Sequence, residues 1–344
     1  MENATLYRGP SGKGPRIVAI GGGTGLSTML RGLKRYTNNL TAIVTVADDG
    51  GGSGVLRQEL GMLPPGDVRN CLEALANVEP VMGELLHYRF TDGSLKGQSF
   101  GNLFLAALNG ISGSFDRAVS LMSQVLAITG RVIPVTTTDV QLEAEFENGA
   151  KVLGESKIFY CKKREDCRIR RVRLLPQHPP ALAPALEAIA EADMIVLGPG
   201  SLYTSIIPNL LVEGIAQAIA DADGLKVYVA NVMTQEGETE GYTNADHIQA
   251  LFQHSLPGLF RLCLVNSASI PQEVTDRYAQ EGAEPVRYDK NACAQLGVEL
   301  VSRPVSTVQN GYVRHDSQLL ASALLELHAQ RSVRIAGLGK YRTE

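Results

Sequence analysis

Short apolar runs alternate along the chain with segments whose apolar residues repeat every three or four positions. The runs are rich in β-branched residues, which is typical of strands buried on both faces of a parallel sheet. We predict strands at Ile17–Ile20, Thr41–Val46, Val132–Thr136, Met194–Leu197, Lys226–Ala230 and Phe260–Val265. Helices are predicted at Leu26–Lys34, Phe104–Leu108, Phe115–Ala127, Asn209–Ala220, from Asn244 onward and at Gln318–His328. This alternation predicts an α/β fold with a doubly wound, mostly parallel, Rossmann-like sheet and helices on both faces.

One stretch breaks the alternation. Val140–Phe146 alternates like a half-buried antiparallel strand, and Asn148-Gly149 is a hairpin signal after which the chain can return. The basic residues between 162 and 173 are interpreted as an edge strand protected by charge, and the alternative is a basic face for an acidic partner. We therefore expect a small β subdomain at about 137–176, inserted in a single α/β domain of residues 15–328. A flexible tail is expected at 1–14 and a polar tail at 329–344.

Composition and charge narrow the class of protein. The 344 residues carry a net charge of -4 and 6% aromatic residues without Trp, which disfavours a nucleic-acid-binding protein. Five cysteines without a C-x-x-C pair indicate neither a disulfide framework nor a zinc site. No signal peptide and no apolar run long enough to span a membrane are found, so a cytoplasmic protein is expected.

The first strand ends in a glycine turn, which is the strongest candidate for a ligand site. Gly21, Gly22, Gly23, Thr24, Gly25 and Leu26 lead from this strand into a helix, an arrangement that suits a phosphate group. Neither register of the turn completes the dinucleotide fingerprint, and no lysine follows as in a Walker loop. An NAD-dependent oxidoreductase is therefore disfavoured.

Polar groups that follow the second strand should face this turn, because ligands bind at the carboxyl ends of parallel strands. Asp48, Asp49, Gly50 and Ser53 form an acidic, glycine-rich loop that could hold sugar hydroxyls or Mg²⁺, or could be an Asp-stabilised turn. Further candidates are Asp67, Arg69, Asn70, Gly101 and Asn102, which lie at two predicted helix starts. Arg69 would serve a ligand phosphate or pair with an acid such as Asp48.

The second half of the chain adds a second glycine turn. Gly198, Gly200 and Ser201 follow the strand at Met194–Leu197 and could hold a second phosphate or a sugar. Asn231 and Thr234 follow the next strand. Arg314 could bind a diphosphate or pair with Asp316. Ser317 stands where a helix N-cap would, which makes it a candidate site of regulatory phosphorylation.

These motifs together resemble the YvcK branch of the CofD/YvcK family, from about residue 15 to 328. The resemblance rests on Ile20–Gly25, Ala47–Gly54, the Pro-Pro-Gly-Asp-Val-Arg-Asn segment that begins at Pro64, and Gly101-Asn102. It implies a gluconeogenesis factor, needed for growth on gluconeogenic carbon and for normal cell shape, that binds UDP-sugars such as UDP-N-acetylglucosamine. The CofD branch instead contains magnesium-dependent 2-phospholactate transferases with a deazaflavin acceptor, and this chain departs from their more acidic pattern after Asp67.

We therefore expect a regulatory UDP-sugar-binding protein with no catalytic residues. Mg²⁺ on Asp48 and Asp49 is a possible addition. The expected partners are the nucleotide sugar, a protein of cell-wall precursor or carbon metabolism and further copies of the chain, with neither nucleic acid nor a membrane span. The alternative is a 2-phospholactate transferase-like enzyme. No nucleophile and base are identified by spacing, although a transferase would need mainly positioned cations and carboxylates.

Overall fold

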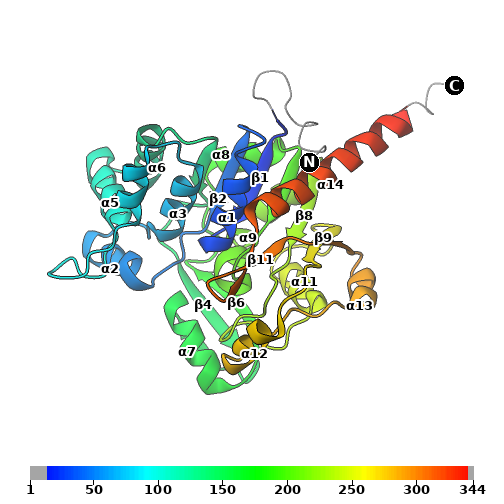
Figure 1. Ribbon diagram of the computed structural model, residues 1–344. Coiled ribbons are helices and arrows are strands. Elements are labelled where there is room, and N and C mark those ends of the chain that lie inside the picture. The colour runs from blue at the N-terminus through cyan, green and yellow to red at the C-terminus, as the bar shows by residue number, and fades with distance from the viewer. Residues whose placement is uncertain (1–13, 340–344) are drawn as a thin grey trace.

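A seven-stranded parallel sheet forms the centre of the molecule in the computed structural model, which describes residues 14–339 (Figure 1). The strand order is β10-β9-β8-β7-β1-β2-β3. Their bounds are β1 Ile17–Gly21, β2 Leu40–Val44, β3 Arg131–Pro134, β7 Met194–Leu197, β8 Leu225–Val229, β9 Leu262–Asn266 and β10 Glu299–Arg303. The order reverses between β1 and β7, and ligands bind outside the carboxyl ends of the strands at such a switch point.

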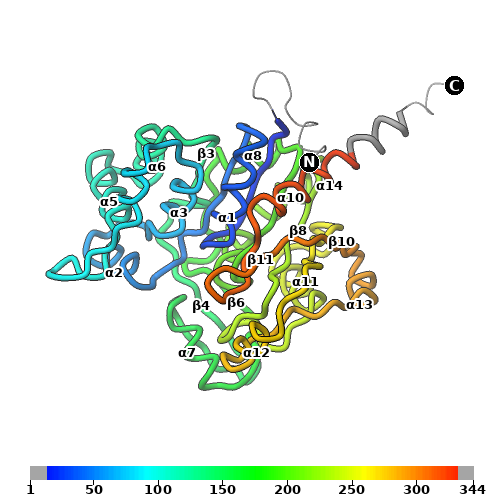
Figure 2. The backbone as a smooth tube through the Cα atoms, viewed as in Figure 1, coloured from blue at the N-terminus to red at the C-terminus, as the bar shows by residue number. Residues whose placement is uncertain are grey.

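Helices cover both faces of this sheet. Helix α1 packs against both α3 and α14 on one face, while α8, α9 and α10 form a group that contacts β1 and β3 (Figures 1 and 2). The helices are α1 Gly23–Leu33, α2 Gly51–Leu60, α3 Gly66–Leu75, α4 Pro80–His87, α5 Phe100–Ser112, α6 Phe115–Val125, α7 Glu155–Glu165, α8 Ala183–Ala190, α9 Ile207–Leu210, α10 Ile215–Asp221, α11 Asn244–Gln253, α12 Gln272–Gln280, α13 Lys290–Gln295 and α14 Ser317–Gly339. The predicted doubly wound α/β fold is confirmed.

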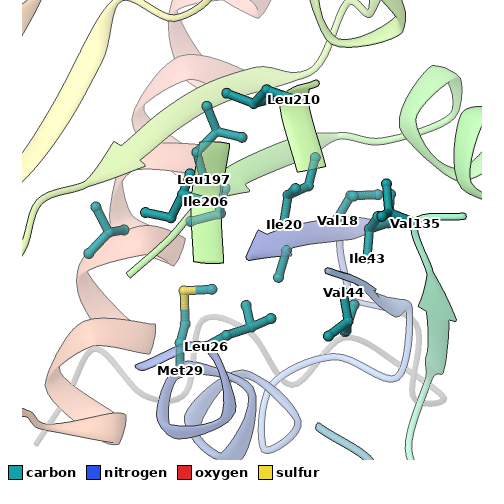
Figure 3. Packing of buried hydrophobic residues seen from close by; sticks show 14 of the residues in the cluster. Val18, Ile20, Leu26, Met29, Ile43, Val44, Val135, Leu197, Ile206 and Leu210 are labelled. Carbon is teal, nitrogen blue, oxygen red and sulfur yellow. The ribbon is translucent and has the colours of Figure 1, made fainter. Parts of the chain in front are cut away.

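The core lies on both sides of β1. Figure 3 shows Leu26 and Met29 of α1 on one side of the strand and Leu210 of α9 on the other. All five residues of β1 are buried, and Ile20 pairs with Ile43 of β2 and with Leu197 of β7. Apolar side chains on both faces explain why the β-branched runs of the sequence become central strands.

A small antiparallel sheet interrupts the α/β alternation, as predicted. It consists of β4 Gln141–Phe146, β5 Lys151–Leu153 and β6 Ile169–Leu175, in the order β5-β4-β6. The prediction of an edge strand holds for β6 but is wrong for the basic residues 162–164, which lie in the last turn of α7. Ile158 and Cys161 form a buried helical face there, and the three cations lie at the negative end of the helix dipole.

Several predicted boundaries are corrected. The helix expected at Asn209–Ala220 is interrupted after Leu210 and resumes at Ile215, where Gly214 has a φ of 86°. The last helix begins at Ser317 and continues through residue 339, so it includes most of the stretch expected to be a tail. The expected N-terminal tail falls, apart from residue 14, outside the described residues.

A short hairpin of β11 Ser306–Gln309 and β12 Tyr312–His315 precedes this helix. Within residues 14–339 no helix is both long and apolar enough to cross a membrane.

Candidate functional site

The turn between β1 and α1 leads directly into a helix N-terminus. Gly22 alone separates the strand from the helix, and it provides no side-chain cap. The first turn of α1 also carries no acidic residue. The Gly23 N–H donates to the Asp67 carboxylate, so the positive dipole end and the other amide N–H groups of the first turn are what the helix offers to an anion.

The two glycine turns touch each other. A Cβ on Gly25 would lie 2.6 Å from the Pro199 carbonyl oxygen, and one on Gly200 would lie 3.2 Å from the Gly22 carbonyl oxygen. Gly198 needs its left-handed φ of 76°, and its peptide bond to Pro199 is cis. Only glycine allows this approach, so the two turns form one continuous backbone surface.

A cleft of about 710 Å³ opens over this surface. Of the predicted site residues it is lined by Gly22, Gly23, Thr24, Gly25, Gly200, Ser201, Asn231, Thr234 and Arg314. The cleft lining also includes residues to which sequence reasoning gave no role, among them Arg31, Tyr278 and Tyr312. None of these belongs to a glycine motif, and they come from elements that the fold brings together, so the sequence carried no signal for them.

Three of the predicted polar groups in the cleft already have partners within the protein. Asn231 donates from its amide to the Gly200 carbonyl at 2.9 Å, and Ser201 donates to Gln235 at 2.8 Å. The Thr234 hydroxyl accepts from the Glu284 N–H at 2.9 Å. These side chains therefore hold the second turn and the loop after β8 in place around the cleft.

Two arginines of the cleft lack a carboxylate partner. Among the ion pairs of the described residues none includes Arg31 or Arg314. The Arg314 guanidinium lies 5.3 Å from the centre of the Tyr312 ring. The proposed pair with Asp316 is not formed, because Asp316 caps α14 by accepting from the N–H groups of residues 318 and 319 at 2.9 Å. The prediction that Ser317 is the N-cap is therefore wrong, although Ser317 lines the cleft.

A group of carboxylates lies behind the first glycine turn. A Cβ on Gly22 would overlap an oxygen of Asp67, and burial together with the charge of Asp48 raises the pKa of Asp67 to about 7. Burial and Asp48 likewise raise the pKa of Glu155 to about 8. Burial raises the pKa of Glu238 to about 7, although its carboxylate accepts from the N–H groups of Tyr203 and Thr204. Sequence reasoning missed Glu155 and Glu238.

The side chains of Asp48 and Asp49 both accept hydrogen bonds from backbone N–H groups. Asp48 accepts from the Gly50 N–H at 2.8 Å, and Asp49 accepts from the Ser156 N–H at 2.7 Å. These bonds match the alternative in which Asp side chains stabilise the loop. Among the described residues no three His, Cys, Asp or Glu side chains are arranged to hold a metal ion.

The remaining predicted residues lie outside the cleft lining. Arg69 pairs with Glu73 at 2.6 Å, so its acid partner is Glu73 rather than Asp48. Gly101 packs against Arg69, and Asn102 is buried in the first turn of α5. The others outside this lining are Gly21, Leu26, Asp48, Asp49, Gly50, Ser53, Asp67, Asn70 and Gly198.

Comparison with known proteins decides the family. The family model for 2-phospho-L-lactate transferase CofD matches residues 17–306. The chain belongs to the CofD family.

Within the CofD family the chain is similar at high identity to gluconeogenesis factors, which confirms the resemblance to the YvcK branch. The gluconeogenesis factor of Bacillus subtilis is 48% identical over 317 residues, which is 92% of this chain and 99% of that protein. A relative from Thermoanaerobacterium thermosulfurigenes is 57% identical over 314 residues, covering 91% and 97% of the two chains. The crystal structure of a UPF0052 family member from Bacillus halodurans is similar with a TM-score of 0.86 at 48% identity, covering 90% of this chain and 99% of that one.

Proposed function

We propose that the protein binds a UDP-sugar, UDP-N-acetylglucosamine in particular, in the cleft over the two glycine turns. The observation that carries the proposal is the convergence of the α1 N-terminus with Arg31 and Arg314 on one cleft, where neither arginine has a carboxylate partner among the described residues. A diphosphate would supply the negative charge that these groups lack. The volume of about 710 Å³ is within the usual range of small-molecule sites.

The rest of the site suits a sugar nucleotide. Carboxylates are good partners for sugar hydroxyls, and Asp67 lies directly against the first glycine turn. Asp67 and Glu155 are protonated through much of the neutral range because their pKa values are about 7 and 8, so they repel a diphosphate less than ionised acids would. If Mg²⁺ accompanies the ligand, we expect ligand phosphates to supply most of its oxygen ligands.

We propose a regulatory output. The bound ligand would report the supply of cell-wall precursor to a cytoplasmic protein of that pathway or of carbon metabolism, which would support growth on gluconeogenic carbon and normal cell shape. The names of the relatives support the link to gluconeogenesis. The transferase alternative predicts product from a nucleotide-activated donor, Mg²⁺ and a deazaflavin, and detection of that product would favour it.

Self-association is also proposed, through α5. This helix has no charged residue between Phe100 and Ser112, yet only Gly101, Asn102 and Leu105 are buried in it. Ile111 is 77% exposed, and Val81 on the neighbouring α4 is 66% exposed. An apolar surface depleted of charge is typical of homodimer interfaces.

Calorimetry tests the proposed ligand. We expect micromolar binding of UDP-N-acetylglucosamine, on the order of 8 kcal/mol, and no binding of NAD. Replacing Arg314 by Gln should weaken binding by about 10- to 100-fold, because charge-assisted hydrogen bonds to phosphate contribute roughly 1.5–3 kcal/mol. The control is Arg303→Gln, since Arg303 pairs with Glu326 and does not line the cleft. Absence of binding to the wild type, or equal binding by both variants, would contradict the proposal.

A further inference from the structure

A second cavity adjoins the cleft. It has a volume of about 380 Å³ and shares Asn231 and Val232 with the cleft as lining residues. Its other walls include Asn266 at the end of β9 and the segment around Val286. A ligand whose diphosphate lies on the glycine turns of β1 and β7 can therefore extend into it beyond β8, on the side of the sheet away from β2.

The walls of this cavity suit a planar ring better than a sugar. Val265, Ile270 and Val286 line it with apolar side chains, and Tyr288 adds a half-exposed aromatic ring. No Asp, Glu, Lys or Arg belongs to its lining among the described residues. A sugar needs a hydrogen-bond partner for each of several hydroxyls, whereas a nucleobase needs apolar contact on its faces and a few polar partners on one edge.

One buried side chain in this cavity makes no hydrogen bond to the part of the chain that the structure describes. Asn244 lines the cavity with 0% of its surface exposed, and within residues 14–339 neither its amide nitrogen nor its amide oxygen has a hydrogen-bond partner. Its backbone N–H donates to the Arg287 carbonyl at 3.1 Å. The start of α11 is capped by the reciprocal bonds of Thr243 and Asp246, so the Asn244 amide is not needed as a cap.

Asn266, another asparagine that lines this cavity, shows the contrast. The Asn266 amide oxygen accepts from the N–H groups of Ala268 and Val305, both at 3.1 Å, and its nitrogen donates to the Ala268 carbonyl. Both polar atoms of the Asn266 amide are therefore hydrogen-bonded to backbone groups. Buried polar atoms without a partner are costly, so a free amide such as that of Asn244 indicates a missing hydrogen-bonding group.

We infer that this second cavity is the nucleobase subsite and that Asn244 recognises the hydrogen-bonding edge of the uracil. The inference rests on the proposed function. The Asn244 amide oxygen would accept from N3–H of the base, and its amide nitrogen would donate to O4. The sugar end of the ligand would then lie on the opposite side of the diphosphate, toward the carboxylates near β2.

A chemical cycle tests this pairing. UDP and 3-methyl-UDP, which lacks the N3–H donor, are titrated by calorimetry into the wild type and into Asn244→Leu. The leucine is similar in size and shape but has no polar atom. We expect the wild type to bind UDP about tenfold more tightly than 3-methyl-UDP, because the methyl group leaves the Asn244 oxygen without a donor. Asn244→Leu should bind UDP more weakly than the wild type and should not distinguish the two nucleotides.

The outcomes separate the two proposals. If the wild type binds UDP and 3-methyl-UDP equally, or if Asn244→Leu keeps the full discrimination, the subsite is refuted and the proposed function stands. If the wild type binds neither UDP nor UDP-N-acetylglucosamine, both fail. Asn38→Leu, a matched change outside both cavities, should leave both affinities unchanged. Thermal unfolding checks that each variant is folded. The comparison of UDP with 3-methyl-UDP on the wild type tests the subsite even if a variant fails to fold.

Discussion

The raised pKa of Asp67, which lies against the first glycine turn, can be tested by measuring how stability depends on pH. Burial and the charge of Asp48 raise its pKa from 3.8 to about 7 in the folded protein. The folded state therefore keeps a proton that the unfolded chain releases near pH 4. The stability that this proton confers is complete below the unfolded pKa and is lost as the pH rises through the folded pKa.

The size of the effect follows from the pH window. From pH 5 to the folded pKa of about 7 the interval is roughly two units, and each unit corresponds to about 1.36 kcal/mol, so ionisation of Asp67 should remove ~2.7 kcal/mol of stability by about pH 8.5. Asp67→Asn cannot ionise and should escape this loss. It should also lower the raised pKa of Glu155, because Asp67 contributes to that shift, and this further flattens the pH dependence.

Urea unfolding at about pH 5 and about pH 8.5 measures the difference. The wild type should lose roughly 2–3 kcal/mol more than Asp67→Asn between these two values. Asp193→Asn is the control, because the hydrogen bond and charge of Arg16 lower the pKa of Asp193. The stability from Asp193 is present above its unfolded pKa, so it stays constant in this window. Parallel pH profiles for wild type and Asp67→Asn would refute the reasoning.

Three further outcomes are expected. Without Mg²⁺, the affinity for UDP-N-acetylglucosamine should fall as the pH rises from about 6 to 9, since Asp67 and Glu155 ionise in this range near the bound diphosphate. Calorimetry at constant ionic strength measures this affinity. A flat pH profile would show that the two carboxylates lie too far from the diphosphate. Gly25→Ala should push the two glycine turns apart, which should lower the free energy of unfolding by about 1–3 kcal/mol and also lower the ligand affinity. The control is Gly110→Ala, where the added Cβ meets nothing within 4 Å, so this change should be neutral or stabilising by up to ~1 kcal/mol. Ile111→Glu should lower the mass measured by light scattering at a given protein concentration, and an unchanged mass would place any self-association elsewhere.

Local signals in the sequence determined most of the fold. The β-branched runs at Ile17–Ile20 and Met194–Leu197 became central strands because side chains on both of their faces had to be buried. The glycines at 22 and 25 marked the turn between β1 and α1, because a close approach of other groups leaves no room for a Cβ there and glycine is therefore required. The helix α7 was missed because its apolar face is narrow and is interrupted by charged residues.

Only the tertiary structure decided which residues share the cleft. Arg31, Tyr312 and His315 meet there because the strand order places β1 beside β7 and because α14 packs on α1. Likewise, Glu155 lies near Asp48, from which it is separated by more than a hundred residues of sequence, and burial together with the charge of Asp48 raises the pKa of Glu155. Burial also raises the pKa of Glu238. Hydrophobic periodicity and turn chemistry depend on residues close together in the sequence. Which side chains meet in the cleft, and which carboxylates are removed from water, depends on how distant helices and strands pack. The sequence therefore determined the elements and the glycine turns, and the packing decided the electrostatics and the shape of the site.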